Sequence, residues 1–316
     1  MAISIALCTY NGEKFLKEQL DSILQQTLLP DELVVCDDRS SDGTLDILRE
    51  FEKSAPFAVR IFHNETNLGP INNFAKAISL CQGDWISLCD QDDLWLPNKL
   101  ELLGRKMVQL ETSLGKHTPI LIHTDAVVTD RNLKEIGKSL WEFQCTYPEK
   151  GHELSKLLNQ SLVTGCTTLV NRALCSKALP LPENALMMHD WWFTLVASAF
   201  GRIESIPEPT ILYRQHGAND TGAKKWGILK AFQSLLDIKN RDYILKTNKE
   251  VSKRIRSQAL AFLTVYEKDL SDWQKRAISA FIDLPNRSYF ERKYLILKYG
   301  LYYQGFIRNI GHLILK

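Results

Sequence analysis

Residues 83–99 read GDWISLCDQDDLWLPNK, and this stretch decides how the rest of the chain is interpreted. An apolar run typical of a buried strand ends in Asp90, Asp92 and Asp93, and Pro97 then opens a segment with helical periodicity. Carboxylates this close together repel one another and shift toward protonation unless a cation or hydrogen-bond donors keep them ionised. A divalent metal carried in with a phosphate ligand would meet that need, because hard metals take oxygen ligands. The alternative is a solvated acidic loop that caps the next helix.

The same order of strand, polar loop and helix occurs three times before this stretch. Strands are expected over residues 2–8, 33–36 and 58–62, each followed by polar residues and then by apolar residues at helical spacing. This alternation predicts an α/β fold with a mostly parallel sheet flanked by helices on both faces. Ligands of such sheets bind beyond the carboxyl ends of the strands. We therefore expect the four polar loops to form one site.

Beyond residue 97 the alternation continues for one more unit and then lapses. The elements expected there are a helix from 97 to about 111, a strand over 119–128, a loop over 141–151, a short helix over 154–158, a strand over 163–170, a helix from 187 to about 200, short strands over 203–206 and 210–213, and helices from Trp226 onward.

Composition indicates an ordinary folded protein. The chain has 316 residues with a hydrophobic fraction of 45%, which is enough for a sizeable core. No apolar run approaches the roughly 20 residues that span a bilayer, and the first residues lack the basic region and cleavage site of a signal peptide. The seven cysteines include no Cys-x-x-Cys pair, so buried free thiols are expected. We expect a cytoplasmic protein.

The formal net charge of +2 hides an uneven distribution. Residues 223–316 carry 19 Lys and Arg against 8 Asp and Glu, whereas residues 1–222 carry 20 against 29. The last part of the chain is therefore strongly basic, and we expect it to meet something anionic.

Several well-known ligand motifs are missing. No Gly-x-Gly-x-x-Gly follows the first strand, and Asn132 stands where a phosphate loop ending in Gly137-Lys138-Ser139 would need its first glycine. Trp95 occupies the glycine position of an EF-hand, and no His-Glu-x-x-His is present. These absences argue against a dinucleotide enzyme, a P-loop enzyme, an EF-hand and a zinc protease.

The motifs that remain resemble, in their order, those of family 2 glycosyltransferases of the GT-A fold. They are Thr9-Tyr10-Asn11-Gly12, Asp37-Asp38-x-Ser40-x-Asp42-Gly43-Thr44, Asn67-x-Gly69, Asp90-Gln91-Asp92-Asp93 and His189-Asp190-Trp191-Trp192. The Asp-Gln-Asp-Asp-x-Trp form and the segment Tyr213-Arg214-Gln215-His216-Gly217 are most similar to the bacterial rhamnosyltransferase-like branch.

This resemblance covers about the first 220 residues and implies a division of the chain. Residues 1–222 would form the GT-A domain, with a nucleotide-sugar-binding half over 1–111 and an acceptor-binding half over 112–222. Residues 223–316 lie outside the resemblance and would form a basic, helical C-terminal extension.

The resemblance also implies a divalent metal, Mg or Mn. Its ligands would come from Asp92, Asp90 and Asp93, with Asp92 the first choice, and Asp90 and Asp92 would also contact the donor. His216 would complete the metal shell or touch the diphosphate, with Arg214 beside it as a phosphate-compatible cation. A structural role for a lone histidine is the competing interpretation.

The donor nucleotide is expected at the first three loops. Asp38 matches the family position that meets the base, where a carboxylate can accept the imide N–H of uracil or thymine; helix capping is the alternative. The resemblance places Thr9, Tyr10 and Asn11 in the same pocket. It also places Asn67 and Asn73 in the donor site, but Asn72 stands where many relatives carry an arginine.

Asp190 matches the family's catalytic base, which takes the proton of an acceptor hydroxyl. A single base with in-line attack implies inversion. The competing interpretation is a carboxylate that only favours a helix N-terminus. Trp191 and Trp192 are either a platform for an acceptor sugar or plain core. His189 and Gly165 complete the expected acceptor site.

The basic end of the chain has two interpretations. Its last residues could form a helix packed on the body, or an interfacial helix on anionic lipid that suits a lipid-linked acceptor and would make the protein peripheral on the inner face of the membrane. The residues behind these interpretations are Tyr294, Leu295, Leu297, Leu301, Phe306, Ile310, Leu313 and Ile314, together with Arg292, Lys293, Lys298, Arg308 and Lys316.

We expect an inverting glycosyltransferase that uses a pyrimidine nucleotide-diphosphate sugar. On resemblance, the favoured donor is dTDP-L-rhamnose and the acceptor a saccharide or lipid-linked saccharide of bacterial cell-surface polysaccharide, not a nucleic acid. A UDP-hexose-dependent transferase is the alternative. A nucleotidyltransferase would need a glycine-rich loop with Thr and Arg, and a noncatalytic sugar-nucleotide-binding protein would lack the Asp-x-Asp loop or the base.

Overall fold

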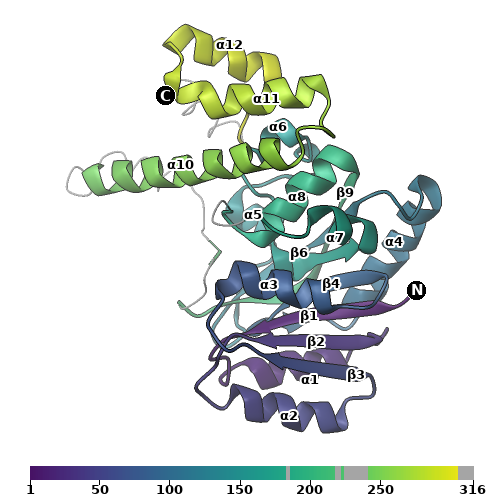
Figure 1. Cartoon of the computed structure of the whole chain (residues 1–316). Coiled ribbons are helices and arrows are strands. Elements are labelled where there is room, and N and C mark those ends of the chain that lie inside the picture. The colour runs from purple at the N-terminus through teal and green to yellow at the C-terminus, as the bar shows by residue number, and fades with distance from the viewer. Residues whose placement is uncertain (183–185, 218–221, 224–240, 305–316) are drawn as a thin grey trace.

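The computed structural model describes residues 1–182, 186–217, 222–223 and 241–304, and a single mixed sheet lies at its centre (Figure 1). The nine strands described have the order β3-β2-β1-β4-β8-β6-β9-β5, with β7 paired to β6. Their bounds are β1 Ile3–Thr9, β2 Glu32–Asp37, β3 Ala58–His63, β4 Trp85–Asp90, β5 Leu94–Trp95, β6 Ile120–Asp130, β7 Glu135–Gly137, β8 Thr168–Asn171 and β9 Arg202–Gln215.

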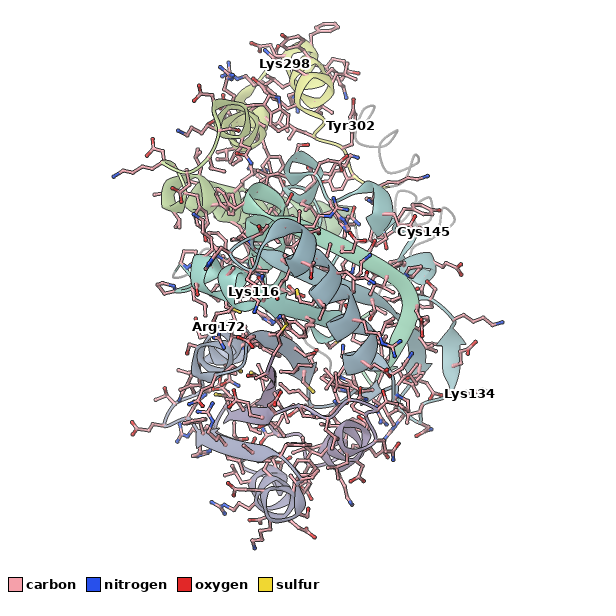
Figure 2. All side chains as sticks on the ribbon, turned by 90° about the vertical axis from the view of Figure 1, so that its right-hand side faces the viewer. Lys116, Lys134, Cys145, Arg172, Lys298 and Tyr302 are labelled. Atoms are coloured by element: carbon pink, nitrogen blue, oxygen red, sulfur yellow. The ribbon has the colours of Figure 1, made fainter. Side chains whose placement is uncertain are left out.

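Helices cover both faces of the sheet. Those described are α1 Leu16–Leu24, α2 Thr44–Ser54, α3 Gly69–Leu80, α4 Lys99–Leu114, α5 Leu140–Gln144, α6 Leu154–Leu157, α7 Arg172–Ala178, α8 His189–Phe200, α10 Arg241–Val265, α11 Asp272–Asp283 and α12 Tyr289–Tyr299. Successive side chains of a strand point to opposite faces, so Ile5 packs with α1, α2 and α4, whereas Ala6 packs with α3, α7 and α8. Side chains fill both layers (Figure 2).

The first four parallel strands end at one edge of the sheet. The register pairs Thr9 with Asp37, Asp37 with His63, and Cys8 with Asp90. The polar loops that follow these strands therefore begin side by side, as the sequence predicted.

Strand β8 runs against its two neighbours, β4 and β6. Because β8 is reversed, it begins at the edge where β4 ends. Gly165–Thr167, a 3-10 turn immediately before β8, is therefore delivered to the same edge as the Asp90 loop. Strands β1 to β4, β6 and β9 share one direction, which agrees with the mostly parallel sheet expected.

Three local expectations were wrong. The strand expected over 163–170 begins only at Thr168, because Gly165–Thr167 form a 3-10 turn before it. The two short strands expected over 203–206 and 210–213 are one strand, β9, which crosses its prolines because its register with β6 shifts there. The loop expected over 141–151 contains helix α5, whose N-terminus is capped by Ser139, since the Ser139 side chain accepts a hydrogen bond from the backbone N–H of Glu142.

Helices α10, α11 and α12 continue the layer that begins with α8 (Figure 1). The Trp192 ring of α8 meets Phe262 and Tyr266 of α10, with ring centroids 5.3 and 5.8 Å apart. In α12, Ile296 and Tyr299 are buried, so this helix is partly packed on the body.

Part of the expected C-terminal pattern lies outside the described residues: the helix expected from Trp226 up to residue 240, and the positions Phe306, Arg308, Ile310, Leu313, Ile314 and Lys316. Among the helices that are described, none combines the length and the apolar character needed to cross a membrane.

Candidate active site

A cavity of about 710 Å³ lies at the edge where the strands end. It is lined by all but four of the residues that the sequence assigned to a site: Thr9, Tyr10, Asn11, Asp38, Asn67, Asn73, Asp90, Asp92, Gly165, His189, Asp190 and His216. The four residues that do not line it are Asp93, Trp191, Trp192 and Arg214. The volume suits a ligand of nucleotide-sugar size.

The loop after β1 is held in a fixed shape. The Thr9 hydroxyl donates to Asp37 (2.9 Å). The Gln91 side-chain amide accepts a hydrogen bond from the Tyr10 backbone N–H (2.8 Å) and donates one to the Tyr10 carbonyl (3.0 Å). Asn11 takes a left-handed backbone (φ 48°), which asparagine tolerates better than most residues. The first loop is thereby tied directly to the Asp90 loop.

Asp38 organises the loops after β2 and β3. Its carboxylate accepts hydrogen bonds from the backbone N–H groups of Leu68 (2.7 Å) and Gly69 (2.9 Å) and from the Asn64 amide (2.8 Å). Asp38 therefore caps the start of α3, whereas the sequence argument had considered capping only of the helix that directly follows it, α2.

Two asparagines complete the network around Asp38. The Asn67 amide donates to the Asp38 carbonyl (3.2 Å), and the Asn73 amide donates to the Cys36 carbonyl (2.8 Å) while accepting from Asn64 (2.8 Å). Both side chains are thus positioned by the backbone around them before any ligand arrives.

Asp92 and His216 both line the cavity and contact each other there. The Asp92 Oδ2 and His216 Nε2 atoms lie 2.7 Å apart, and the imidazole packs on the Phe15 ring with centroids 4.9 Å apart. Strand β5 carries the Asp90 loop against β9, which places two residues far apart in the sequence within hydrogen-bond distance. Asp90 lines the same cavity.

Asp93 belongs to the same loop as Asp90 and Asp92, but its side chain is buried in the interior and does not line the cavity. It is fully buried, and its carboxylate accepts from the backbone N–H of Arg214 (3.1 Å). Burial, together with the charges of Asp92 and Asp90, raises the pKa of Asp93 well above its usual range. Ligand atoms of Asp90, Asp93 and Cys166 come within 4.8 Å of one another, and burial raises the pKa of the Cys166 thiol.

Arg214 does not act as the cavity cation that was expected. Arg214 is 2% exposed, and its guanidinium donates to the backbone carbonyls of Asp92 (2.8 Å) and Arg131 (2.9 Å) and to the Glu18 carboxylate. Two other cations, Lys14 and Arg131, line the cavity instead. Lys14 follows the first loop and could have been suspected from its position; Arg131 comes from the turn after β6 and has no local signal.

Asp190 lies in the first turn of α8 and lines the cavity. One carboxylate oxygen accepts from the backbone N–H of Gly165 (2.9 Å) and the other from that of Trp191 (2.6 Å). Burial raises the pKa of Asp190 to about 6, and the two N–H groups oppose this shift. The carboxylate is therefore fixed in place and suited to exchange a proton near neutral pH.

His189 lies beside Asp190 with no hydrogen-bond partner on either ring nitrogen among the described residues. Its ring is 3% exposed and stacks on Phe74 with centroids 4.1 Å apart. Burial lowers the pKa of His189 to about 3, so the imidazole is neutral at physiological pH. A Cβ at Gly165 would lie 3.3 Å from His189 Nε2, so glycine allows the close approach of these segments.

Trp191 and Trp192 do not form the sugar platform considered from the sequence. Their indole N–H groups donate to the carbonyls of Leu157 (2.7 Å) and Ala178 (3.1 Å), and both rings are buried in the core. The core interpretation is correct for both, because the face of α8 that carries them is covered by α6, α7 and α10.

A sequence profile described as glycosyl transferase family 2 matches residues 4–179. The chain is 28% identical to dTDP-rhamnosyl transferase RfbG of Shigella flexneri over 228 residues, covering 69% of this chain and 74% of that protein. It spans 59% of the length of curated mycobacterial relatives that are 28% identical to it over 218 residues.

Two solved structures show a similar fold. Staphylococcus aureus TarS 1–349 in complex with UDP has a TM-score of 0.58 at 20% identity and covers 90% of this chain and 71% of its own. The mannosyltransferase PcManGT of Pyrobaculum calidifontis, in complex with GDP-Man and Mn2+, has a TM-score of 0.50 at 15% identity. The match covers 95% of this chain and 79% of the mannosyltransferase chain. The chain therefore belongs to glycosyltransferase family 2 and has the GT-A fold.

Proposed function

We propose that this protein transfers a sugar, with inversion, from a pyrimidine nucleotide-diphosphate donor to a hydroxyl of a saccharide or lipid-linked saccharide in bacterial cell-surface polysaccharide. dTDP-L-rhamnose is the favoured donor. One observation carries the proposal: a single cavity joins the loops of the expected donor site to the Asp190 carboxylate. Residues 1–111 would hold the donor, and residues 112–222, which supply Gly165 and Asp190, would hold the acceptor.

The donor preference rests on Asp38 and on one relative. Among the described residues, Asp38 Oδ2 accepts one hydrogen bond, from the backbone N–H of Gly69, and a carboxylate oxygen can accept more than one. It could therefore take the imide N–H of thymine or uracil. The similarity to RfbG favours a rhamnosyl donor, whereas the UDP complex of TarS keeps a UDP-hexose as the alternative.

A divalent metal fits at Asp92 and His216, and Asp90 lines the same cavity. Their side chains have carboxylate oxygens and an imidazole nitrogen as possible metal ligands, and these ligand types suit Mg or Mn. Asp93 and Cys166 fit less well, since both lie in the interior and burial favours the protonated thiol. When bound, the metal would supply Lewis-acid stabilisation of the charge that grows on the leaving diphosphate.

Asp190 would act as the general base. Its carboxylate takes the proton of the acceptor hydroxyl while that oxygen bonds to the anomeric carbon and the bond to the diphosphate oxygen breaks. The backbone N–H groups of Gly165 and Trp191 hold the carboxylate in place for this step. The neutral ring of His189, whose nitrogens need partners, would hydrogen-bond a sugar hydroxyl.

A donor panel tests the proposal. The purified protein is incubated with Mn2+, a saccharide acceptor and dTDP-L-rhamnose, UDP-glucose, UDP-N-acetylglucosamine or GDP-mannose. Release of nucleoside diphosphate and the anomeric configuration of the glycoside formed are measured by NMR. Faster release from dTDP-L-rhamnose with an inverted product is the expected result. Faster release from a UDP-hexose would select the alternative donor.

Two other results would reject the enzyme class. Binding of nucleotide sugars without any release would indicate a noncatalytic binding protein. Formation of pyrophosphate from a nucleoside triphosphate and a sugar phosphate would indicate a nucleotidyltransferase.

A further inference from the structure

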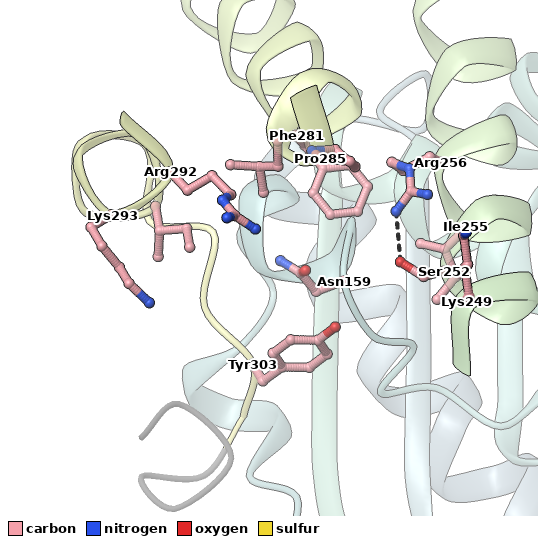
Figure 3. A pocket seen from close by; sticks show the side chains of 12 residues that line it. Asn159, Lys249, Ser252, Ile255, Arg256, Phe281, Pro285, Arg292, Lys293 and Tyr303 are labelled. Carbon is pink, nitrogen blue, oxygen red and sulfur yellow. Dashed lines mark hydrogen bonds between the residues drawn. The ribbon is translucent and has the colours of Figure 1, made fainter. Parts of the chain in front are cut away.

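A second cavity, of about 270 Å³, lies among α10, α11, α12 and the segment that follows α6 (Figure 3). Its apolar wall includes Ile255, Phe281 and Ile296. Apart from Asn159, all of its lining residues lie outside the residues matched by the family profile, and none of the residues assigned to catalysis lines it.

The charges around this cavity have one sign. Lys249, Arg256, Arg292 and Lys293 line it, and among the described lining residues none is acidic. Arg256 donates one hydrogen bond to the Ser252 hydroxyl (2.6 Å), which orients its guanidinium (Figure 3). Four cations around a small volume repel one another, so the arrangement favours an anion between them.

Buried donors in the cavity are also without partners. Asn159 is 4% exposed, and its Nδ2 has no hydrogen-bond partner among the described residues; the same holds for Nε of Arg292. Figure 3 shows the Asn159 amide between Arg292 and Arg256. Buried polar groups are rarely left unpaired, so these donors indicate an acceptor group that enters the cavity.

We propose that this cavity binds the phosphate group of a lipid. Arginine guanidinium groups and an amide N–H are suited to phosphate oxygens, and the apolar wall is suited to the hydrocarbon next to the phosphate. The ligand class is a phosphate joined to an apolar chain, which a membrane phospholipid and a polyprenyl phosphate both provide.

The exposed face of α12 favours a lipid as the source of the phosphate group. Phe290, Tyr294 and Leu297 follow a spacing that places them on one face of the helix, and they are 82%, 59% and 62% exposed. The same helix supplies Arg292 and Lys293 to the cavity. Exposed aromatic and aliphatic side chains next to basic ones are typical of helices that lie at a membrane surface.

A lining residue of this cavity and a lining residue of the active-site cavity are only five positions apart in the sequence. Asn159 lines the phosphate site and Thr164 lines the catalytic cavity, so their Cα atoms are at most about 18 Å apart, the reach of five extended residues. If the proposed function is correct, on which this last step rests, a lipid-linked acceptor could keep its phosphate at Asn159 while its sugar reaches Asp190.

Vesicle binding tests the proposal. The full chain is sedimented with three kinds of vesicle. The first contains phosphatidylcholine alone, the second also contains an anionic phospholipid, and the third also contains a polyprenyl phosphate. The variants are Arg256→Gln, Arg292→Gln and Asn159→Asp, and the control is Lys298→Gln, which removes one charge from an outward-facing position of α12 (Figure 2). Thermal melting checks that each variant is folded.

We expect the control to lose at most about fivefold in affinity, the effect of one surface charge. The three cavity variants should lose about tenfold or more, because each weakens a direct contact to phosphate. Stronger binding to the polyprenyl phosphate assigns the site to the acceptor, and equal binding to both lipids assigns it to membrane phosphate.

Equal binding to phosphatidylcholine vesicles, in which choline offsets the charge of the phosphate, and to vesicles that also contain an anionic phosphate lipid would overturn the proposal, as would cavity variants that lose no more than Lys298→Gln. Release of nucleoside diphosphate from the donor in the absence of vesicles is measured on the same samples. That reaction reports the proposed glycosyl transfer without the lipid site, so the two proposals can fail separately.

Discussion

Asp190 differs from a simple helix-terminal carboxylate because a second segment, through Gly165, also holds it at the cavity. Asp190→Asn should lower kcat by about 10²- to 10⁴-fold, the usual contribution of a general base, while the donor Kd stays within about twofold. Turnover and calorimetric donor titration measure the two quantities. Asp46→Asn, on the exposed side of α2, is the matched control; equal losses of binding and turnover would contradict the role of base.

The pH dependence of turnover should follow the same carboxylate. Because the pKa of Asp190 in the free protein is raised to about 6, the base is protonated below that pH, and kcat/KM should fall about tenfold per pH unit there and level off above it. The raised pKa has the opposite effect on stability: the contribution of Asp190 is complete below about pH 4 and is lost as pH rises through about 6. A kcat/KM profile that is flat from pH 4.5 to 8 would argue against this assignment.

Removal of metal should stop the reaction if Asp92 and His216 bind it. With EDTA we expect transfer to fall below detection and to return with added Mn2+. His216→Ala should raise the Mn2+ concentration needed for half-maximal activity by about tenfold, as loss of one ligand contact of 1–2 kcal/mol would. His117→Ala, at an exposed position remote from the cavity lining, is the control. Full activity in EDTA would refute the metal proposal.

At the scale of elements, Asp38 joins the end of β2 to the start of α3. Asp38→Ala removes acceptors from the backbone N–H groups of Leu68 and Gly69, so the free energy of unfolding should fall by about 0.5–2 kcal/mol. Denaturant unfolding measures this loss. Asp46→Ala, whose side chain is exposed, should change stability by less than about 0.5 kcal/mol. An unchanged stability in Asp38→Ala would show that the cap contributes nothing.

The sequence could predict that the polar loops meet because parallel strands bring their ends together wherever the strands are recognised. The register confirms that β1, β2 and β4 end side by side, and the family resemblance singled out Thr9, Asp38 and Asp90 within the loops. Arg131 could not be found, since its turn reaches the cavity only through the pairing of β6 with β9.

Helix α8 shows why the side of the cavity that contains Asp190 was harder to predict. His189 and every residue over 191–197 are buried, so the helix has no polar face from which its orientation could be read. Sequence spacing therefore did not show that Asp190 points to the cavity while Trp191 and Trp192 point into the core. The expected helix itself was correct.

At the scale of the whole molecule, α10 to α12 share one apolar core with α8. Phe262 is fully buried against Trp192, so Phe262→Ala should cost about 3–5 kcal/mol of stability. Leu260→Ala, on the exposed side of the same helix, is the control and should cost far less. A single unfolding transition by both fluorescence and circular dichroism is expected. Two separate transitions would show that the C-terminal helices unfold independently.

The reversed strand β8 has a consequence for how this protein can diversify. The loops after β1, β2 and β4 follow the ends of strands, whereas Gly165 precedes the beginning of β8, so the two sides of the cavity come from separate segments of the chain. Substitutions in the turn before β8 would therefore alter the Gly165 side of the cavity and leave the ends of β1, β2 and β4 in place.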